Sequence, residues 1–155
     1  MRILLVEDDD RIVQFMRRGF EGEDHAIDHA SDSRTALDRL ESARYDVAVL
    51  DVYLGDEDGL ALCREMRCRS CDIPVMIMTA KDSPEMKSAS FLAGADAFLA
   101  KPFAFDEMLL TLFRLTRSET SQGLPGGGAS RAFLTEGEPD ELNFTECDNH
   151  PGGAL

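Results

Sequence analysis

Polar residues directly follow several short apolar runs of this sequence, at positions where they could act together. Glu7 and Asp8 come after the first run, Asp51 ends another, and Thr79 and Lys101 follow two more. Carboxylate oxygens with no His or Cys among them favour a hard cation, Mg²⁺ before Zn²⁺. A carboxylate, a metal ion and a lysine together favour an aspartyl-phosphate intermediate, and a threonine hydroxyl adds a donor. The pattern therefore predicts metal-assisted phosphoryl chemistry at these strand ends.

Three acids in one small cavity need a counter-charge. At an effective dielectric constant of about 20, two carboxylates about 4 Å apart repel each other by about 4 kcal/mol. Magnesium relieves such repulsion through one or two carboxylates, and it keeps waters and a phosphate oxygen as further ligands. Taken singly, Asp8 or Asp9 could cap a helix, but the coincidence of polar groups at four strand ends favours a shared site.

Alternating strands and helices must position these residues. Apolar runs predict five strands, and amphipathic runs predict five helices. The strands are expected at residues 3–6, 25–29, 47–50, 75–78 and 97–99, and the helices at residues 11–20, 35–43, 60–68, 84–93 and 105–117. Such alternation requires a parallel sheet with helices on both faces, whose ligand site lies beyond the carboxyl ends of the strands. If the first and third strands are neighbours, Glu7, Asp8 and Asp51 share one cavity.

Composition restricts the class of protein. The 155 residues include 30 acidic and 16 basic side chains, a net charge of -14, and 43% are hydrophobic. That hydrophobic fraction can build a core, whereas so acidic a surface repels nucleic acid and disfavours DNA binding by this chain alone. No apolar run approaches the roughly 18 residues that span a membrane. Residues 1–6 are too short for a signal-peptide core, so we expect a cytoplasmic protein.

The composition changes near residue 118. Residues 1–119 are predicted to form the folded domain, and residues 120–155 a linker and tail. The linker is rich in Gly and Pro over residues 123–128, which is typical of a flexible connection. The tail is acidic and lacks sustained periodicity, so we expect it to be disordered.

Four segments resemble the motifs of response-regulator receiver domains. They are Leu5–Asp9, Val49–Gly59, Met78–Ala80 and Phe98–Phe103, and their order and spacing match that family over residues 1 to about 117. The sequences of Arg2–Asp9 and Ala93–Asp96 are most similar to the OmpR/PhoB subfamily. The resemblance implies the flavodoxin-like (CheY-like) α/β fold: a five-stranded parallel sheet in the order 2-1-3-4-5, with five helices on its two faces.

The resemblance also implies a role for each acid. Asp51 is the implied phosphoacceptor. Asp8 would ligate Mg²⁺ directly, and Glu7 would ligate it through a water molecule. Asp51 itself and the backbone carbonyl of Tyr53 would complete the protein ligands.

A conformational switch is implied as well. Thr79 and Lys101 would bind oxygens of the phosphoryl group, and the Lys101–Pro102 bond is often cis in this family. As Thr79 moves inward, Phe98 at the switch-aromatic position would rotate into the vacated space. The surface formed by the last two helices and the strand between them would then change.

Partners follow from the same resemblance. A sensor histidine kinase would supply the phosphoryl group, and the switching surface would bind a downstream protein or a second copy of the chain. Thr111 and Phe113 stand where the subfamily is usually basic, so we expect weakened or altered homodimerisation through this face. Residues 129–155 are too few for a winged-helix DNA-binding domain of about 100 residues. The chain is therefore interpreted as a stand-alone receiver or a shortened OmpR-like transcriptional regulator, and in neither case as a turnover enzyme.

Other classes of protein share parts of this pattern. A flavodoxin-like FMN carrier needs a hydroxyl- and glycine-rich phosphate loop, and the acids after the first strand would repel that phosphate. A haloacid-dehalogenase-type phosphatase, which is also Mg²⁺-dependent and forms an aspartyl phosphate, places a second acid two residues after its nucleophile, where this chain has Tyr53. A metal-free scaffold domain would leave the polar groups at four strand ends unexplained.

Overall fold

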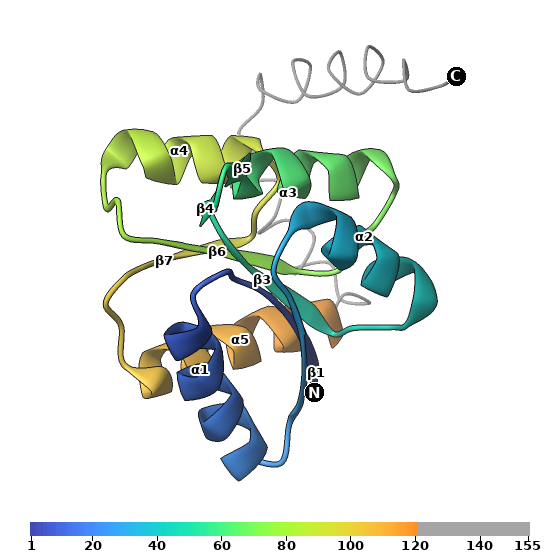
Figure 1. Cartoon of the computed structure of the whole chain (residues 1–155), viewed down its shortest axis with the longest axis vertical. Helices are drawn as coiled ribbons and strands as arrows, with labels where there is room; N and C mark the ends of the chain where they lie inside the picture. Colours follow the sequence, from blue (N-terminus) through green and yellow to red (C-terminus); the bar gives the residue numbers. More distant parts are fainter. Residues whose placement is uncertain (121–155) are drawn as a thin grey trace.

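A five-stranded parallel sheet forms the centre of the described chain (Figure 1). The computed structural model describes residues 1–120, and side chains as far as Arg117. The strands of this sheet are β1 (Arg2–Val6), β2 (Ala26–Ala30), β3 (Val47–Asp51), β6 (Val75–Thr79) and β7 (Ala97–Ala100), and the helices are α1 (Asp10–Gly22), α2 (Ser33–Ser42), α3 (Gly59–Cys68), α4 (Pro84–Leu92) and α5 (Phe105–Thr120). The order β2-β1-β3-β6-β7 is the predicted 2-1-3-4-5 arrangement, because β6 and β7 are the fourth and fifth strands of the sheet. The predicted fold class is confirmed.

Helices cover both faces of the sheet, and each face has its own core. In Figure 1, α2, α3 and α4 lie on one side of the sheet, and α1 and α5 lie on the other. The core under α2, α3 and α4 includes Leu4, Val6, Ala48, Leu50, Leu62, Met66 and Ile77. The core under α1 and α5 includes Ile3, Leu5, Met16, Phe20, Val49, Met76, Met78, Met108 and Leu112. Because β3 and β6 are buried on both faces, their sequences are nearly continuous apolar runs.

Short polar side chains begin four of the helices. Asp9, Asp32, Asp58 and Ser83 stand at the N-cap positions of α1, α2, α3 and α4, and each accepts a hydrogen bond from a backbone N–H of the first turn. These bonds satisfy N–H groups that have no partner within the helix. Pro84 occupies the start of α4, as predicted from the sequence.

Two local features depart from the sequence pattern. A small antiparallel ribbon, β4 (Tyr53–Leu54) and β5 (Glu57–Asp58), follows β3 and turns at Gly55, whose φ is +61°. Strands of two residues are too short for periodicity to predict them. On α1, helical spacing predicts Phe15 on the buried face, but its side chain is 46% exposed.

The predicted linker and acidic tail lie outside the described residues, except for Thr120, which ends α5. The last helix therefore extends three residues beyond its expected end at residue 117. Within residues 1–120, every helix is too short or too polar to cross a membrane.

Candidate metal centre

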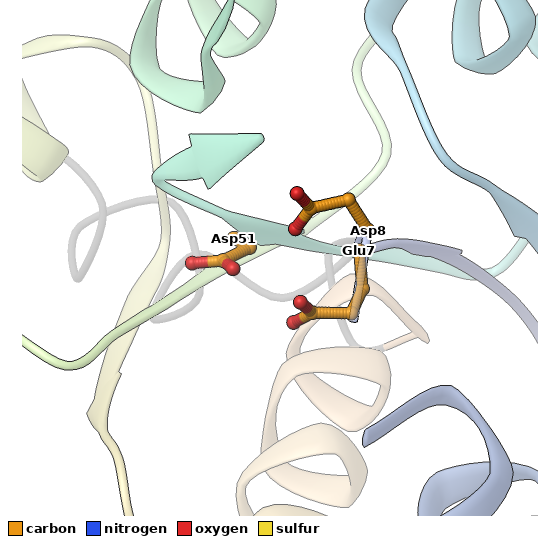
Figure 2. A group of neighbouring side chains, drawn as sticks. All are labelled: Glu7, Asp8 and Asp51. Carbon is orange, nitrogen blue, oxygen red and sulfur yellow. The ribbon is translucent and has the colours of Figure 1, made fainter. Parts of the chain in front are cut away.

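Three carboxyl groups converge at the carboxyl edge of the sheet (Figure 2). Strands β1 and β3 pair in parallel, so Glu7 and Asp8 at the end of one lie beside Asp51 at the end of the other. One carboxylate oxygen from each residue lies within 4.8 Å of the other two. In Figure 2 the carboxyl groups of Glu7 and Asp8 extend from the end of β1 toward Asp51. The structure thus brings together the acids that the sequence predicts to share a cavity.

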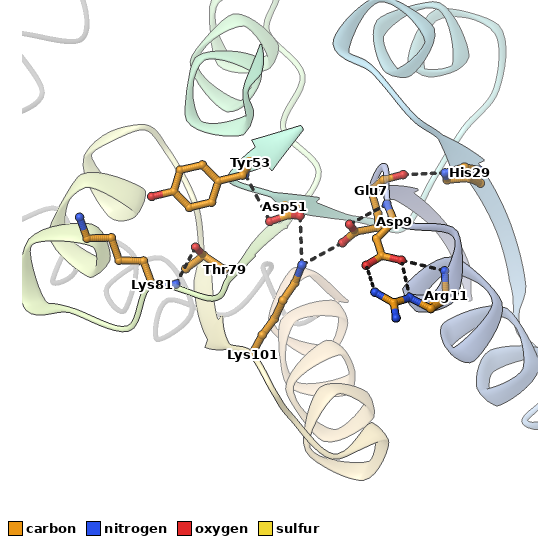
Figure 3. A network of polar contacts seen from close by, with 9 residues as sticks. All are labelled: Glu7, Asp9, Arg11, His29, Asp51, Tyr53, Thr79, Lys81 and Lys101. Atoms are coloured by element: carbon orange, nitrogen blue, oxygen red, sulfur yellow. Dashed lines mark hydrogen bonds and ion pairs between the residues drawn. The ribbon is translucent and has the colours of Figure 1, made fainter. Parts of the chain in front are cut away.

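Lys101 provides positive charge to this cluster from the end of β7 (Figure 3). Its Nζ donates to Asp51 Oδ2 at 3.0 Å and to Glu7 Oε1 at 3.2 Å. Burial acts to lower the pKa of Lys101, but the hydrogen bond to Asp51 and the charges of both carboxylates outweigh it, so the pKa is raised. The ammonium group therefore stays charged at neutral pH and neutralises part of the cluster.

Glu7 is the most perturbed acid of the cluster. Its side chain is 1% exposed, and burial, followed by the charge of Asp51, raises its pKa from 4.5 to about 7. The N–H of Asp9 and the Lys101 ammonium act in the opposite direction, because both stabilise the ionised form. Without a cation, Glu7 is therefore protonated for part of the time near neutral pH.

The donor set suits a hard divalent cation. Every ligand atom in the group is a carboxylate oxygen, which is what Mg²⁺ and Ca²⁺ prefer. Asp51 is buried while Asp8 is exposed, so the cluster is open to solvent on the side of Asp8. An open side leaves room for the waters that Mg²⁺ retains. The residues present therefore fit magnesium.

The neighbouring acid Asp9 has a structural role instead. Its Oδ1 accepts from the backbone N–H of Arg11 at 2.9 Å, and its carboxylate also lies near the Arg11 guanidinium. The hydrogen bonds to Arg11 lower the pKa of Asp9. Of the two acids that the sequence left open, Asp9 caps α1 and Asp8 joins the cluster.

Gly59, the last residue of the Val49–Gly59 motif, shapes the loop after Asp51. A Cβ atom at position 59 would lie 2.0 Å from the Asp51 carbonyl oxygen, a distance that no side chain tolerates. The N–H of Gly59 also donates to the carbonyl of Val52 at 2.7 Å. Only glycine lets α3 begin so close to the strand that carries Asp51. This requirement depends on tertiary distance, which periodicity does not reveal.

The predicted switch residues lie on β6, which pairs with β3, and on β7, which pairs with β6 at the edge of the sheet. Thr79 is fully buried at the end of β6, and its Oγ1 accepts from the backbone N–H of Lys81 at 3.1 Å (Figure 3). The N–H of Lys101 donates to the Thr79 carbonyl at 2.8 Å, which joins the ends of β6 and β7. Phe98 is half-buried and packs against the core under α2, α3 and α4. The Lys101–Pro102 peptide bond is cis, as the family resemblance implies.

Tyr53 stands at the edge of the cluster. Its backbone N–H donates to Asp51 Oδ1 at 3.3 Å, so it helps to orient that carboxylate. Its side chain is 50% exposed and contributes no group to the acidic cluster. The use of its backbone carbonyl as a metal ligand stays a prediction.

Sequence comparisons connect this site to a known family. Residues 3–113 match the family model described as the response regulator receiver domain. The response regulator MprA of Mycolicibacterium vanbaalenii is 38% identical over 133 residues, which cover 86% of this chain and 58% of that protein. MprA of Mycobacterium avium is 40% identical over 117 residues, which cover 76% of this chain and 51% of that protein. The chain thus spans about half the length of the curated relatives it matches.

Solved structures agree with the sequence comparisons. The receiver domain of the Francisella response regulator 1452 matches with a TM-score of 0.71 at 33% identity, covering 75% of this chain and 96% of that chain. The Vibrio cholerae chemotaxis protein CheY4 matches with a TM-score of 0.70 at 30% identity, covering 74% of this chain and 97% of that chain. The shared fold and a family model that matches most of the described residues lead to one conclusion: this chain belongs to the response regulator receiver domain family.

Proposed function

We propose that this chain is a switch of a two-component system, phosphorylated on Asp51 by a sensor histidine kinase in a Mg²⁺-dependent reaction. The observation that supports this most directly is the convergence of Glu7, Asp8 and Asp51 within 4.8 Å, with Lys101 Nζ 3.0 Å from Asp51 Oδ2. A buried carboxylate beside a cation site and a lysine has the groups that an acceptor of phosphoryl transfer needs. The proposal places the reaction in the cytoplasm.

In the reaction, a carboxylate oxygen of Asp51 attacks the phosphorus atom of the donor. A new O–P bond forms while the bond from phosphorus to the kinase imidazole nitrogen breaks, and that nitrogen keeps the electron pair. Magnesium held by Asp8, Asp51 and the Tyr53 carbonyl, with Glu7 acting through water, would neutralise charge on the phosphoryl oxygens. Lys101 already reaches the Asp51 carboxylate, so its ammonium is placed to bind a phosphoryl oxygen without a large movement.

The output of the switch is a changed surface on α4, β7 and α5. When a phosphoryl group is attached to Asp51, the Thr79 hydroxyl exchanges its bond with the Lys81 N–H for a bond to a phosphoryl oxygen. Phe98 then turns toward the space that Thr79 leaves. A shift from mostly inactive to mostly active requires several kcal/mol of preference for the active state. A downstream protein or a second copy of the chain would recognise the new surface.

Intact mass spectrometry tests the proposal. The protein is incubated with acetyl phosphate, with and without Mg²⁺, and we expect one added phosphoryl group only when Mg²⁺ is present. Asp51→Ala should abolish the addition. Asp46→Ala is the matched control, because Asp46 precedes the opposite end of the same strand and accepts from the Arg2 backbone N–H. Addition that survives Asp51→Ala, or that ignores Mg²⁺, contradicts the proposal.

A second candidate is that the chain represents the receiver part of a longer or shortened OmpR-like regulator. Its support is that the matched MprA proteins are about twice as long as the matched segment. A phosphatase is less well supported, because Tyr53 stands where such an enzyme carries its second acid. We expect no sustained release of phosphate from p-nitrophenyl phosphate, and multiple turnovers in that assay would favour the phosphatase instead.

A further inference from the structure

The backbone of Glu7 is bound to β2 through both of its polar groups. Its N–H donates to the Ala30 carbonyl at 3.0 Å, which is the last backbone bond between β1 and β2. Its carbonyl oxygen lies 2.7 Å from Nε2 of the His29 side chain (Figure 3). Strand β2 ends at Ala30, and the following residues lead into α2. An imidazole therefore binds the Glu7 carbonyl where the ladder of strand pairing ends.

This contact requires that Nε2 of the His29 imidazole carry a proton. A carbonyl oxygen only accepts hydrogen bonds, so Nε2 of His29 must carry the proton and donate. Glu7 is 1% exposed, so little water reaches this part of the chain. Loss of the imidazole donor would leave a buried carbonyl without its partner, which folded proteins rarely tolerate.

The same contact determines the direction in which Asp8 leaves the strand. The peptide group between Glu7 and Asp8 is planar, so holding the Glu7 carbonyl also fixes the plane of the Asp8 N–H. The Glu7 carboxylate is held separately by the N–H of Asp9 and by Lys101. His29 thus supplies the constraint that the other contacts lack: it fixes the backbone from which both acids project.

We infer that His29 is a positioning residue for the cation site, acting through the Glu7 carbonyl and never as a ligand itself. The inference rests on the proposed function, in which Glu7, Asp8 and Asp51 hold Mg²⁺. Groups that orient metal ligands from behind typically contribute 10–100-fold to metal affinity. Because His29 acts through the backbone, we expect the lower end, a loss of about tenfold when its donor is removed.

Three variants test the inference by calorimetric titration with MgCl₂. His29→Leu removes the donor, and we expect its Mg²⁺ dissociation constant to rise about tenfold. His29→Gln places an amide N–H the same number of bonds from Cα, and we expect affinity within about twofold of the wild type. His25→Leu is the matched control, because His25 packs against Phe20 and Phe113 beyond the amino end of the same strand. It should leave Mg²⁺ affinity unchanged.

The outcomes separate positioning from simple stability. Equal Mg²⁺ affinity in His29→Leu and the wild type overturns the inference, as does a His29→Gln protein that binds as weakly as His29→Leu. If His29→Leu does not fold, two measurements still test the inference. One is the Mg²⁺ affinity of His29→Gln relative to the wild type, and the other is the imidazole ¹⁵N spectrum of the wild type, which reports the tautomer of His29. A protonated Nε2 is expected there, and an Nδ1–H tautomer overturns the contact. A wild type that binds no Mg²⁺ contradicts the proposed function instead, while those spectra still report on His29.

Discussion

Replacing Glu7 by Gln should stabilise the metal-free protein at alkaline pH. The pKa of Glu7 is raised from 4.5 to about 7, chiefly by burial and then by the charge of Asp51. Between pH 4.5 and 7 the folded state therefore holds a proton that the unfolded state releases, so the free energy of unfolding falls as the pH rises. At about 1.4 kcal/mol per tenfold change in proton affinity, the loss amounts to about 3 kcal/mol above pH 7. Gln keeps the shape of the side chain and never ionises.

Urea unfolding in the presence of EDTA, followed by circular dichroism, measures this effect. At pH 8 we expect Glu7→Gln to be more stable than the wild type by about 1–3 kcal/mol, since weaker bonds to Asp9 and Lys101 offset part of the gain. At pH 5 the difference should nearly vanish. Glu85→Gln, on the exposed first turn of α4, is the control and should show no such dependence on pH. A Glu7→Gln protein that gains nothing at pH 8, or gains equally at both pH values, would refute the reasoning.

Three further predictions concern a glycine beside the site, an arginine at the opposite edge of the sheet and the surface of α5. Gly59→Ala should destabilise the protein by about 3 kcal/mol or more in thermal melts, because its Cβ would meet the carbonyl at the end of β3, whereas Gly22→Ala meets nothing within 4 Å and should be near neutral. Arg67→Ala should cost about 2–4 kcal/mol in urea unfolding, because this side chain binds three backbone carbonyls and a carboxylate; Arg67→Lys should recover only part of it. Thr111 and Phe113 stand at positions of α5 where the OmpR/PhoB subfamily usually has basic residues that bear on homodimerisation. The phosphorylated chain should therefore sediment as a weak dimer or a monomer, and a tight dimer through α4 and α5 would contradict this.

Much of the fold could be predicted because parallel strands that are buried on both faces appear in the sequence as continuous apolar runs. The runs at residues 3–6, 47–50 and 75–78 are apolar on both faces, so each predicts a central strand. Once their order is known, the positions of the acids follow, because the carboxyl ends of parallel strands meet at one edge. Asp9 shows the limit of this reasoning: only the observed cap on α1 separates it from Asp8.

What the sequence did not reveal depends on contacts between elements. The role of Gly59 requires the distance to the Asp51 carbonyl, and the role of His29 requires the register of β1 against β2. Phe15 shares the spacing of Met16 and Phe20, yet those two residues are buried while Phe15 is 46% exposed. Periodicity gives the face of a helix to within about one residue, and tertiary packing decides the rest.

The two separate cores have a consequence for how this protein could be altered. The sheet stands between them, and residues far apart without shared partners usually contribute independently to stability. Phe98 and α4 pack on the side of α2 and α3, while Phe20, Met108 and Leu112 pack on the opposite side. The proposed output surface on α4, β7 and α5 therefore draws on both cores, because α4 belongs to one side of the sheet and α5 to the other. A mutation that repacks one core can thus adjust one half of that surface while the packing of the other half stays in place.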